Sequence, residues 1–143
     1  MEKSDVRILV VDDEEDILKS LKTHLELDGY GVEVAGSAAE ALDKIRLGKI
    51  HIVLADINMP QMDGIELLEQ IRKIRGDIFV IMITAYTSLM KVANSRFHGA
   101  TDYVLKPFRD LSELDEVVET AYKQVLRWDR VMAETMKTKK KSQ

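Results

Sequence analysis

No cysteine occurs among the 143 residues of the chain, so disulfide bonds and thiolate metal sites are excluded, and a reducing cytosol is permitted. Apolar runs longer than a strand are also lacking, which argues against a membrane-spanning helix. The polar start, residues 1–5, shows no signal peptide and leads straight into an apolar run. From these absences we expect a cytoplasmic protein that does not contact a membrane.

Neither an internal repeat nor a linker rich in serine, glycine or proline divides the chain. Its length suits one domain with a full core. The net charge is −4, with an acidic block at 12–16 and lysines at 137 and 139–141. A few lysines without interleaved aromatic residues are only a weak sign of nucleic-acid binding, so we expect no direct contact with nucleic acid.

Short apolar runs typical of strands alternate with segments that have helical spacing. The expected strands are 7–11, 32–35, 50–55, 79–84 and 102–105. Helices are expected over 14–27, from a capping box at Ser37 to Gly48, over 63–74, over 87–98, and from 110 onward. Five strands that alternate with five helices predict an α/β fold, in which a doubly wound parallel sheet carries helices on both faces.

The last helix is unusually long, because apolar residues keep an alternating three–four spacing from Leu111 to Met132. The stretch from Leu111 to Met136 would measure about 39 Å at the standard helical rise. We therefore expect a domain at 5–125 and, at 126–143, an extension of the last helix with a basic tail. The apolar stripe of the extension needs a partner, which predicts a homodimer through this helix. Fraying or folding back in the free protein is the alternative.

Polar side chains follow four of the expected strands at the point where each strand ends. Asp12 and Asp13 follow the first strand, Asp56 ends the third, and Thr84 and Lys106 end the fourth and fifth. Each has a simple explanation taken alone, as a helix cap, a turn residue or a solvated lysine. Because the carboxyl ends of parallel strands share one edge of the sheet, we expect all five side chains in one crevice.

The chemistry of this set is coherent. Three carboxylates in a crevice repel one another and need a cation, and ligation by oxygen alone favours a hard ion such as Mg²⁺. An aspartate beside such an ion can act as a nucleophile and form an aspartyl phosphate. A lysine and a hydroxyl group would hold the remaining phosphoryl oxygens. The residues therefore indicate phosphoryl transfer to an aspartate.

These segments resemble the receiver domain of bacterial two-component response regulators. The resemblance covers roughly residues 7–122, and the matching segments are 8–14 (Ile-Leu-Val-Val-Asp-Asp-Glu), 56–60 (Asp-Ile-Asn-Met-Pro), 62–64 (Met-Asp-Gly), 83–85 (Ile-Thr-Ala), 99–103 (Gly-Ala-Thr-Asp-Tyr) and 106–108 (Lys-Pro-Phe). It implies a flavodoxin-like (βα)5 fold with sheet order 2-1-3-4-5. The long last helix resembles the linker to the effector domain in enhancer-binding transcription activators.

The resemblance also implies roles around a metal ion. Asp56 would be the phosphoacceptor. Asp13 and Asp56 would ligate Mg²⁺, or Mn²⁺ in its place, together with the backbone carbonyl of Asn58. Asp12 would act through a metal-bound water, and Lys106 would pair with the phosphoryl group.

A conformational switch is implied as well, in which Thr84 moves toward the phosphate and Tyr103 turns inward. The donor would be a sensor histidine kinase or a histidine phosphotransfer protein. The chain would be no turnover enzyme but a phosphoacceptor domain that assists its own phosphorylation and dephosphorylation. The surface of the fourth helix, fifth strand and fifth helix would carry the output or a second kind of homodimer contact.

Two other functions share part of this pattern. A Mg²⁺-dependent aspartyl phosphohydrolase would need an acid–base carboxylate two residues after its nucleophile, where this chain has Asn58, and also a cap over its substrate. A phosphorylation-independent scaffold would have lost some of the acidic or lysine residues, and none is lost here. Both functions remain alternatives to the phosphorylated switch.

Overall fold

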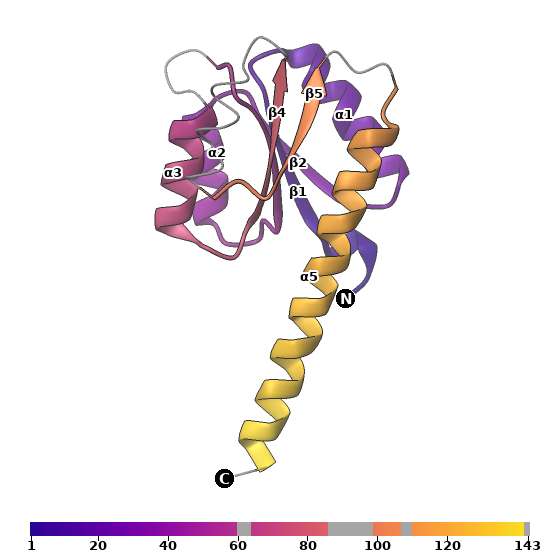
Figure 1. The fold of residues 1–143 in the computed structure, drawn as a ribbon, viewed down its shortest axis with the longest axis vertical. Coiled ribbons are helices and arrows are strands. Elements are labelled where there is room, and N and C mark those ends of the chain that lie inside the picture. The colour runs from indigo at the N-terminus through magenta and orange to yellow at the C-terminus, as the bar shows by residue number, and fades with distance from the viewer. Residues whose placement is uncertain (60–63, 86–98, 107–109, 142–143) are drawn as a thin grey trace.

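The structure is a computed structural model of the chain, and it describes residues 1–59, 64–85, 99–106 and 110–141. In chain order the elements are a short 3-10 helix η1 (Lys3–Asp5), β1 (Arg7–Val11), α1 (Glu15–Leu27), β2 (Gly31–Ala35), α2 (Ala38–Arg46), β3 (Ile52–Asp56), α3 (Gly64–Ile74), β4 (Phe79–Ala85), β5 (Asp102–Lys106) and α5 (Ser112–Lys141) (Figure 1). The helix expected over 87–98 lies outside the described residues, as do Pro60, Met62, Asp63, Pro107 and Phe108 of the matching segments.

Five parallel strands form one sheet in the order β2-β1-β3-β4-β5. The chain first turns from β1 to β2 on one side and then crosses to β3 on the other side. Strand order therefore reverses between β1 and β3, and open α/β sheets bind their ligands outside the carboxyl ends of the strands at such a point. The predicted fold class and sheet order are confirmed.

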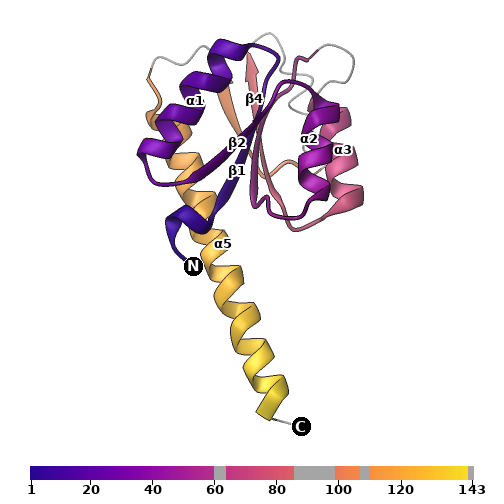
Figure 2. The ribbon, with the colours of Figure 1, turned by 180° about the vertical axis from the view of Figure 1, so that it is seen from behind.

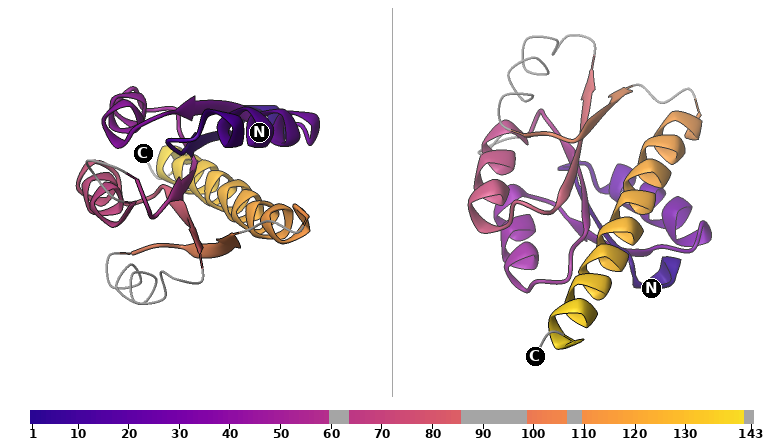
Figure 3. Two further views of the ribbon diagram at one scale, coloured as in Figure 1. Left: turned by 90° about the horizontal axis from the view of Figure 1, so that it is seen from above. Right: turned by 60° about the horizontal axis from the view of Figure 1, so that its bottom comes forward.

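Two helical layers enclose the sheet. Helices α1 and α5 cover one face, and α2 and α3 cover the other (Figures 2 and 3). All five residues of β3 are buried, since a central parallel strand has helices on both sides. Alternate residues of β1 enter different cores: Ile8 and Val10 pack with α1 and α5, whereas Leu9 and Val11 pack with α2 and α3.

The start of α2 follows the predicted capping box with one difference. The Ser37 hydroxyl accepts the backbone N–H of Glu40 at 3.2 Å, as expected. The Glu40 carboxylate accepts the N–H of Gly36, at 3.0 Å, instead of the N–H of Ser37. The helix begins where the sequence predicts, because the same two side chains satisfy free backbone groups at its first turn.

Helix α5 has 30 residues and a length of about 45 Å at the standard rise. Its inner face is buried against the sheet at Leu114, Val118, Ala121 and Val125. Residues 126–141, here called the extension, project beyond the sheet (Figure 1). Among the helices of the described residues, none combines the length and apolarity needed to cross a bilayer.

Gly64 fixes the distance between α3 and the segment that follows β3. Its N–H donates to the carbonyl of Ile57 at 2.8 Å. A Cβ atom at this position would lie 2.6 Å from the carbonyl oxygen of Asp56 and 2.7 Å from both the Ile57 Cα and the Met82 Cε. Two of these three atoms belong to backbone, which cannot rotate aside, so only glycine lets the helix begin here.

We expect Gly64→Ala to lower the free energy of unfolding by about 1–3 kcal/mol, because the added methyl group overpacks a closed site. Urea denaturation checks this. Gly76→Ala is the matched control, since a Cβ atom there meets nothing within 4 Å. Its effect should stay within about 0.5 kcal/mol. Equal losses in the two variants would contradict the packing argument.

Candidate functional site

Three carboxylates meet at the carboxyl ends of β1 and β3. One oxygen each from Asp12, Asp13 and Asp56 lies within 4.8 Å of the others. Asp12 and Asp56 are buried, with 1% and 7% of their surface exposed, whereas Asp13 is exposed. The carboxylates expected in one crevice are therefore brought together, and one of them faces solvent.

The backbone holds both buried carboxylates in the same way. Oδ1 of Asp12 accepts the N–H of Glu14 at 2.9 Å, and Oδ1 of Asp56 accepts the N–H of Asn58 at 3.0 Å. Asp56 therefore bonds its own turn, as its simple explanation expects, and Asp12 makes the same kind of turn contact, in which the acceptor lies two residues before the donor. In each case it uses one oxygen and leaves Oδ2 for a contact across the crevice.

Lys106 makes that contact with both aspartates. Its Nζ donates to Oδ2 of Asp12 at 3.1 Å and to Oδ2 of Asp56 at 3.2 Å. Burial lowers the pKa of Lys106, but the hydrogen bond to Asp12 and the charges of the two aspartates raise it further, so the pKa lies above its ordinary value of 10.5. Lys106 is therefore protonated at neutral pH and neutralises part of the acidic cluster.

Thr84 and Tyr103 lie on the strands beside this cluster. Thr84 is fully buried near the end of β4. The residue before it, Ile83, pairs with Asp56 of β3. Tyr103 pairs with Met82 and packs, half-buried, against the core under α2 and α3. Because Met82 and Thr84 are two residues apart on one strand, Thr84 and Tyr103 share this face of the sheet.

The donor set fits a divalent metal ion. Three carboxylates and one ammonium group leave a formal charge of −2, and every available donor is oxygen. Hard cations such as Mg²⁺ prefer these ligands. Asp12, Asp13 and Asp56 each offer one carboxylate oxygen that could ligate such an ion, and the exposed Asn58 lies two residues beyond Asp56.

Sequence reasoning found every residue of this cluster but missed the contacts of Lys106 with Asp12 and Asp56. It assigned the lysine to a phosphoryl group, whereas the structure places its ammonium between Asp12 and Asp56. A usable signal was present, because several carboxylates expected in one crevice with a lysine need its positive charge as their counter-charge.

We expect Lys106→Met to lower the free energy of unfolding by about 1–3 kcal/mol, since two buried carboxylates lose their counter-charge. A raised lysine pKa stabilises the fold below the ordinary value of 10.5, and this contribution is lost as the pH rises through the pKa of the folded protein. The deficit should therefore be constant between about pH 6 and 9 and shrink only above about pH 10.5.

Urea titrations across this pH range measure the deficit. Lys19→Met is the matched control, because Lys19 pairs with Glu15 at 3.4 Å on an exposed helix face. That loss should stay below about 0.5 kcal/mol. A Lys106→Met deficit no larger than that of the control would refute the stabilising role of the pair.

Comparisons with known proteins agree with this geometry. A model of the response regulator receiver domain family matches residues 8–119. Response regulator MprA of Mycobacterium sp. strain KMS is 40% identical over 103 residues, which cover 72% of this chain and 45% of that protein. MprA of Mycobacterium tuberculosis strain H37Ra is 39% identical over the same length. The chain thus spans about half the length of the curated relatives it matches.

Solved structures give the same result. A receiver domain protein of Clostridium thermocellum has a TM-score of 0.77 at 33% identity, covering 85% of this chain and 98% of its own. Thermotoga maritima TrrA, solved in complex with Mg²⁺ and BeF, has a TM-score of 0.73 at 40% identity and covers 81% of this chain and 98% of its own. Brucella abortus NtrX, solved with ADP, has a TM-score of 0.79 at 31% identity and covers 87% of this chain and 29% of its own. The chain belongs to the response regulator receiver domain family of two-component signalling.

Proposed function

We propose that Asp56 accepts a phosphoryl group from a phosphohistidine of a sensor histidine kinase or a histidine phosphotransfer protein. A carboxylate oxygen of Asp56 attacks the phosphorus, and the bond from phosphorus to the donor imidazole nitrogen breaks. The observation that carries the proposal is Lys106, whose ammonium lies 3.2 Å from Asp56 and 3.1 Å from Asp12. It places a positive charge where phosphoryl oxygens would arrive.

The surrounding residues would bind the metal ion and orient the Asp56 carboxylate. Asp13 and Asp56, with the backbone carbonyl of Asn58, would hold Mg²⁺, and Asp12 would act through a metal-bound water. The ion, when bound, supplies positive charge that offsets the charge of the transferring group. The N–H of Asn58 keeps the Asp56 carboxylate oriented, which lowers the reorganisation that attack requires.

The response to phosphorylation would pass through Thr84 and Tyr103. A phosphoryl group on Asp56 brings two negative charges and three acceptor oxygens beside the end of β4. The Thr84 hydroxyl would bond one of these oxygens, and Tyr103, on the same face of the sheet, would occupy the space that Thr84 leaves. Residues 5–125 would form this switch, and 126–143 would connect it to an output or a partner.

The rival phosphohydrolase is disfavoured by the position two residues after the nucleophile. Asn58 stands there in place of an acid–base carboxylate, and its N–H is committed to Oδ1 of Asp56. Without that carboxylate, nothing at this position can activate water for rapid turnover.

Acetyl phosphate with Mg²⁺ tests the proposal, because this small donor brings no protein residues of its own. Intact mass should show one added phosphoryl group, lost in Asp56→Asn and absent when EDTA removes the metal. Mn²⁺ should substitute for Mg²⁺. Asp43→Asn is the control, since that exposed carboxylate pairs with Arg46 on α2.

Two results would contradict the proposal, and a third would invalidate the control. An adduct that survives Asp56→Asn would show that another residue is the phosphoacceptor. Rapid multiple turnover of simple phosphate esters would instead favour the phosphohydrolase. Loss of the adduct in Asp43→Asn would mean that any missing carboxylate disrupts the reaction.

A further inference from the structure

A groove of about 660 Å³ lies at the end of the sheet opposite to Asp56, where β3, β4 and β5 begin. It is here called the basal groove. Its apolar walls come from the body of the domain (Met1, Ile50 and Phe79) and from α5 (Val125, Trp128 and Met132). Nothing in the proposed phosphoryl chemistry uses this surface.

The size of the basal groove suits a small molecule better than a folded protein. Sites for small organic ligands are typically concavities of about 300–1,000 Å³ with mostly apolar walls. The groove falls within this range, and 14 residues line it. A standard protein–protein interface takes about 20–30 residues from each side. The groove is therefore large enough for an organic molecule and small for a protein interface.

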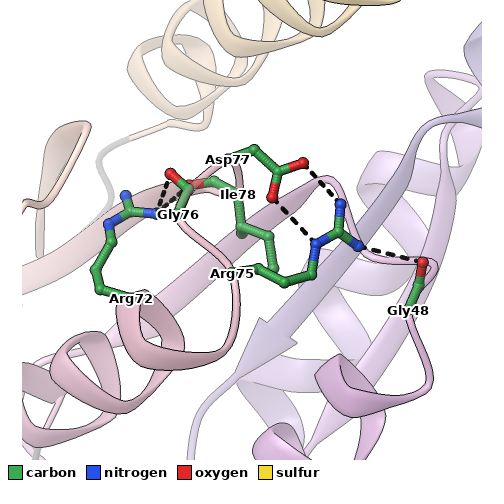
Figure 4. Close-up of polar contacts among 6 residues, drawn as sticks. All are labelled: Gly48, Arg72, Arg75, Gly76, Asp77 and Ile78. Carbon is green, nitrogen blue, oxygen red and sulfur yellow. Dashed lines mark hydrogen bonds and ion pairs between the residues drawn. The ribbon is translucent and has the colours of Figure 1, made fainter.

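Both arginines that line the basal groove are already engaged in hydrogen bonds. Arg75 donates to the two carboxylate oxygens of Asp77, at 3.1 and 2.7 Å, and to the Gly48 carbonyl (Figure 4). Arg72 donates to three backbone carbonyls, those of Gly76, Ile78 and Gly99. Guanidinium groups committed in this way are poorly placed to capture an anion from solution.

Asp129 differs from these charged residues, because its carboxylate is available to a ligand. It lines the groove, is exposed, and directly follows Trp128 in α5. Within the described part of the chain, no side chain or backbone group forms a hydrogen bond or an ion pair with the Asp129 carboxylate. The groove therefore presents an unpaired negative charge together with the indole ring of Trp128.

His51 adds a hydrogen-bond donor to the groove but no charge near neutral pH. Its Nδ1 accepts the N–H of Arg7 at 3.0 Å, so the proton of the neutral ring resides on Nε2. Burial and the nearby charge of Arg75 lower the pKa of His51, and the charges of Asp77 and Asp129 offset only part of this effect. A ligand would therefore meet a neutral imidazole beside the Asp129 carboxylate.

We propose that the basal groove binds a small organic amine with an apolar aromatic body. The ammonium group would pair with Asp129, and the aromatic body would pack among Ile50, Phe79 and Met132. Trp128 would contribute in both ways, since an indole packs against apolar groups and also attracts a cation to its face. This site lies apart from Asp56, and the proposal does not rest on its phosphorylation.

The head group of the ligand is selected by charge. A carboxylate head group would be repelled by Asp129 and would find both guanidinium groups engaged elsewhere. An uncharged head group would gain the apolar contacts alone. An ammonium group gains the same contacts and also supplies the counter-ion that Asp129 lacks, which makes the bond to it charge-assisted.

A ligand in this position would join the extension to the body of the domain. Trp128 and Met132 are 60% and 59% exposed, so their packing against the body is incomplete. An isolated helix of about 16 residues is marginal in water, and the extension has little else to hold it. Because a ligand stabilises the state that binds it, the amine would make the extension a firmer continuation of α5.

Three probes with one apolar body and different head groups test the site: phenylbutylamine, phenylbutanol and phenylbutyrate. Each is titrated into the full chain, and the emission of Trp128, the chain's single tryptophan, reports binding. We expect saturable changes, with the amine bound about 5-fold more tightly than the alcohol, as for a partly exposed ion pair. The carboxylate should bind most weakly.

Asp129→Asn should abolish the preference for the amine and leave the affinity for the alcohol unchanged. Its circular dichroism should match that of the unaltered chain, since Asp129 is exposed. Met132→Ser should weaken binding of all three probes alike, on the order of 5-fold, because it removes part of the apolar wall.

Glu134→Gln is the matched control. It removes the same charge from the same helix, but Glu134 does not line the groove and lies nine residues from Val125, on the opposite face of α5. The 5-fold preference for the amine should survive in this variant. Equal losses in Glu134→Gln and Asp129→Asn would show a general effect of charge and would overturn the pairing with Asp129.

Four further results would overturn the proposal. They are the absence of saturable binding by any probe, equal affinities for the amine and the alcohol, an amine preference that survives Asp129→Asn, and tightest binding of the carboxylate, which would show that the arginines select the ligand. None of these readouts involves Asp56, so they stand or fall separately from the proposed phosphorylation.

Hydrogen exchange tests the position of the ligand between the extension and the body. Saturating phenylbutylamine should slow deuterium uptake by the backbone amides of residues 126–141 and leave uptake in α2 unchanged. The alcohol at equal occupancy should act in the same direction, because it makes the same apolar contacts. Unchanged uptake across the extension would overturn this position.

Discussion

The ammonium group of Lys106 lies between two buried carboxylates from the ends of two neighbouring strands. Asp12 follows β1 and Asp56 ends β3, and their shared partner is the last residue of β5. Carboxylates so close together destabilise a fold unless a counter-charge sits between them. The order of the sheet supplies one, because the carboxyl ends of all five strands share one edge.

Lys106 neutralises only part of the negative charge of the three carboxylates, and the remaining charge favours binding of a cation. One ammonium group cannot balance three carboxylates, so the crevice retains affinity for a divalent cation. The backbone N–H groups of Glu14 and Asn58 fix the buried carboxylates before any ligand arrives. The site is therefore organised in advance, and a phosphoryl group would need only Lys106 to exchange one oxygen partner for another.

Features that depend on local pattern were predictable from the sequence. Apolar runs gave the strands, and polar residues at their ends gave Asp12, Asp56 and Lys106 as one cluster. Features that depend on long-range packing were not. Which oxygens Lys106 contacts depends on side-chain rotamers. The close approach of α3 to β3 brings Gly64 against the backbone of Asp56 and Ile57, and the groove at the base of the sheet combines Met1 with Trp128 from the other end of the chain.

The direction of the extension is set by the body of the domain rather than by its own sequence. Asp115 in the first turn of α5 lies 2.7 Å from His24 of α1. About two turns further along α5, Tyr122 packs edge-on against Tyr30, with 5.6 Å between the ring centroids. The ammonium group of Lys3 lies over the Tyr30 ring. Leu114, Val118, Ala121 and Val125 are buried along the same helix, so α5 leaves the body in a fixed direction.

A helix fastened in this way transmits its orientation over its whole length. A rotation of about 10° at the start of α5 would displace its end, about 45 Å away, by about 8 Å. Helix α5 begins at Ser112, six residues after Lys106, where β5 ends at the acidic cluster. The buried side chains Leu114, Val118, Ala121 and Val125 keep one face of α5 against the sheet. A partner of the extension would therefore meet a helix whose orientation is set by the packing of α5 on the sheet.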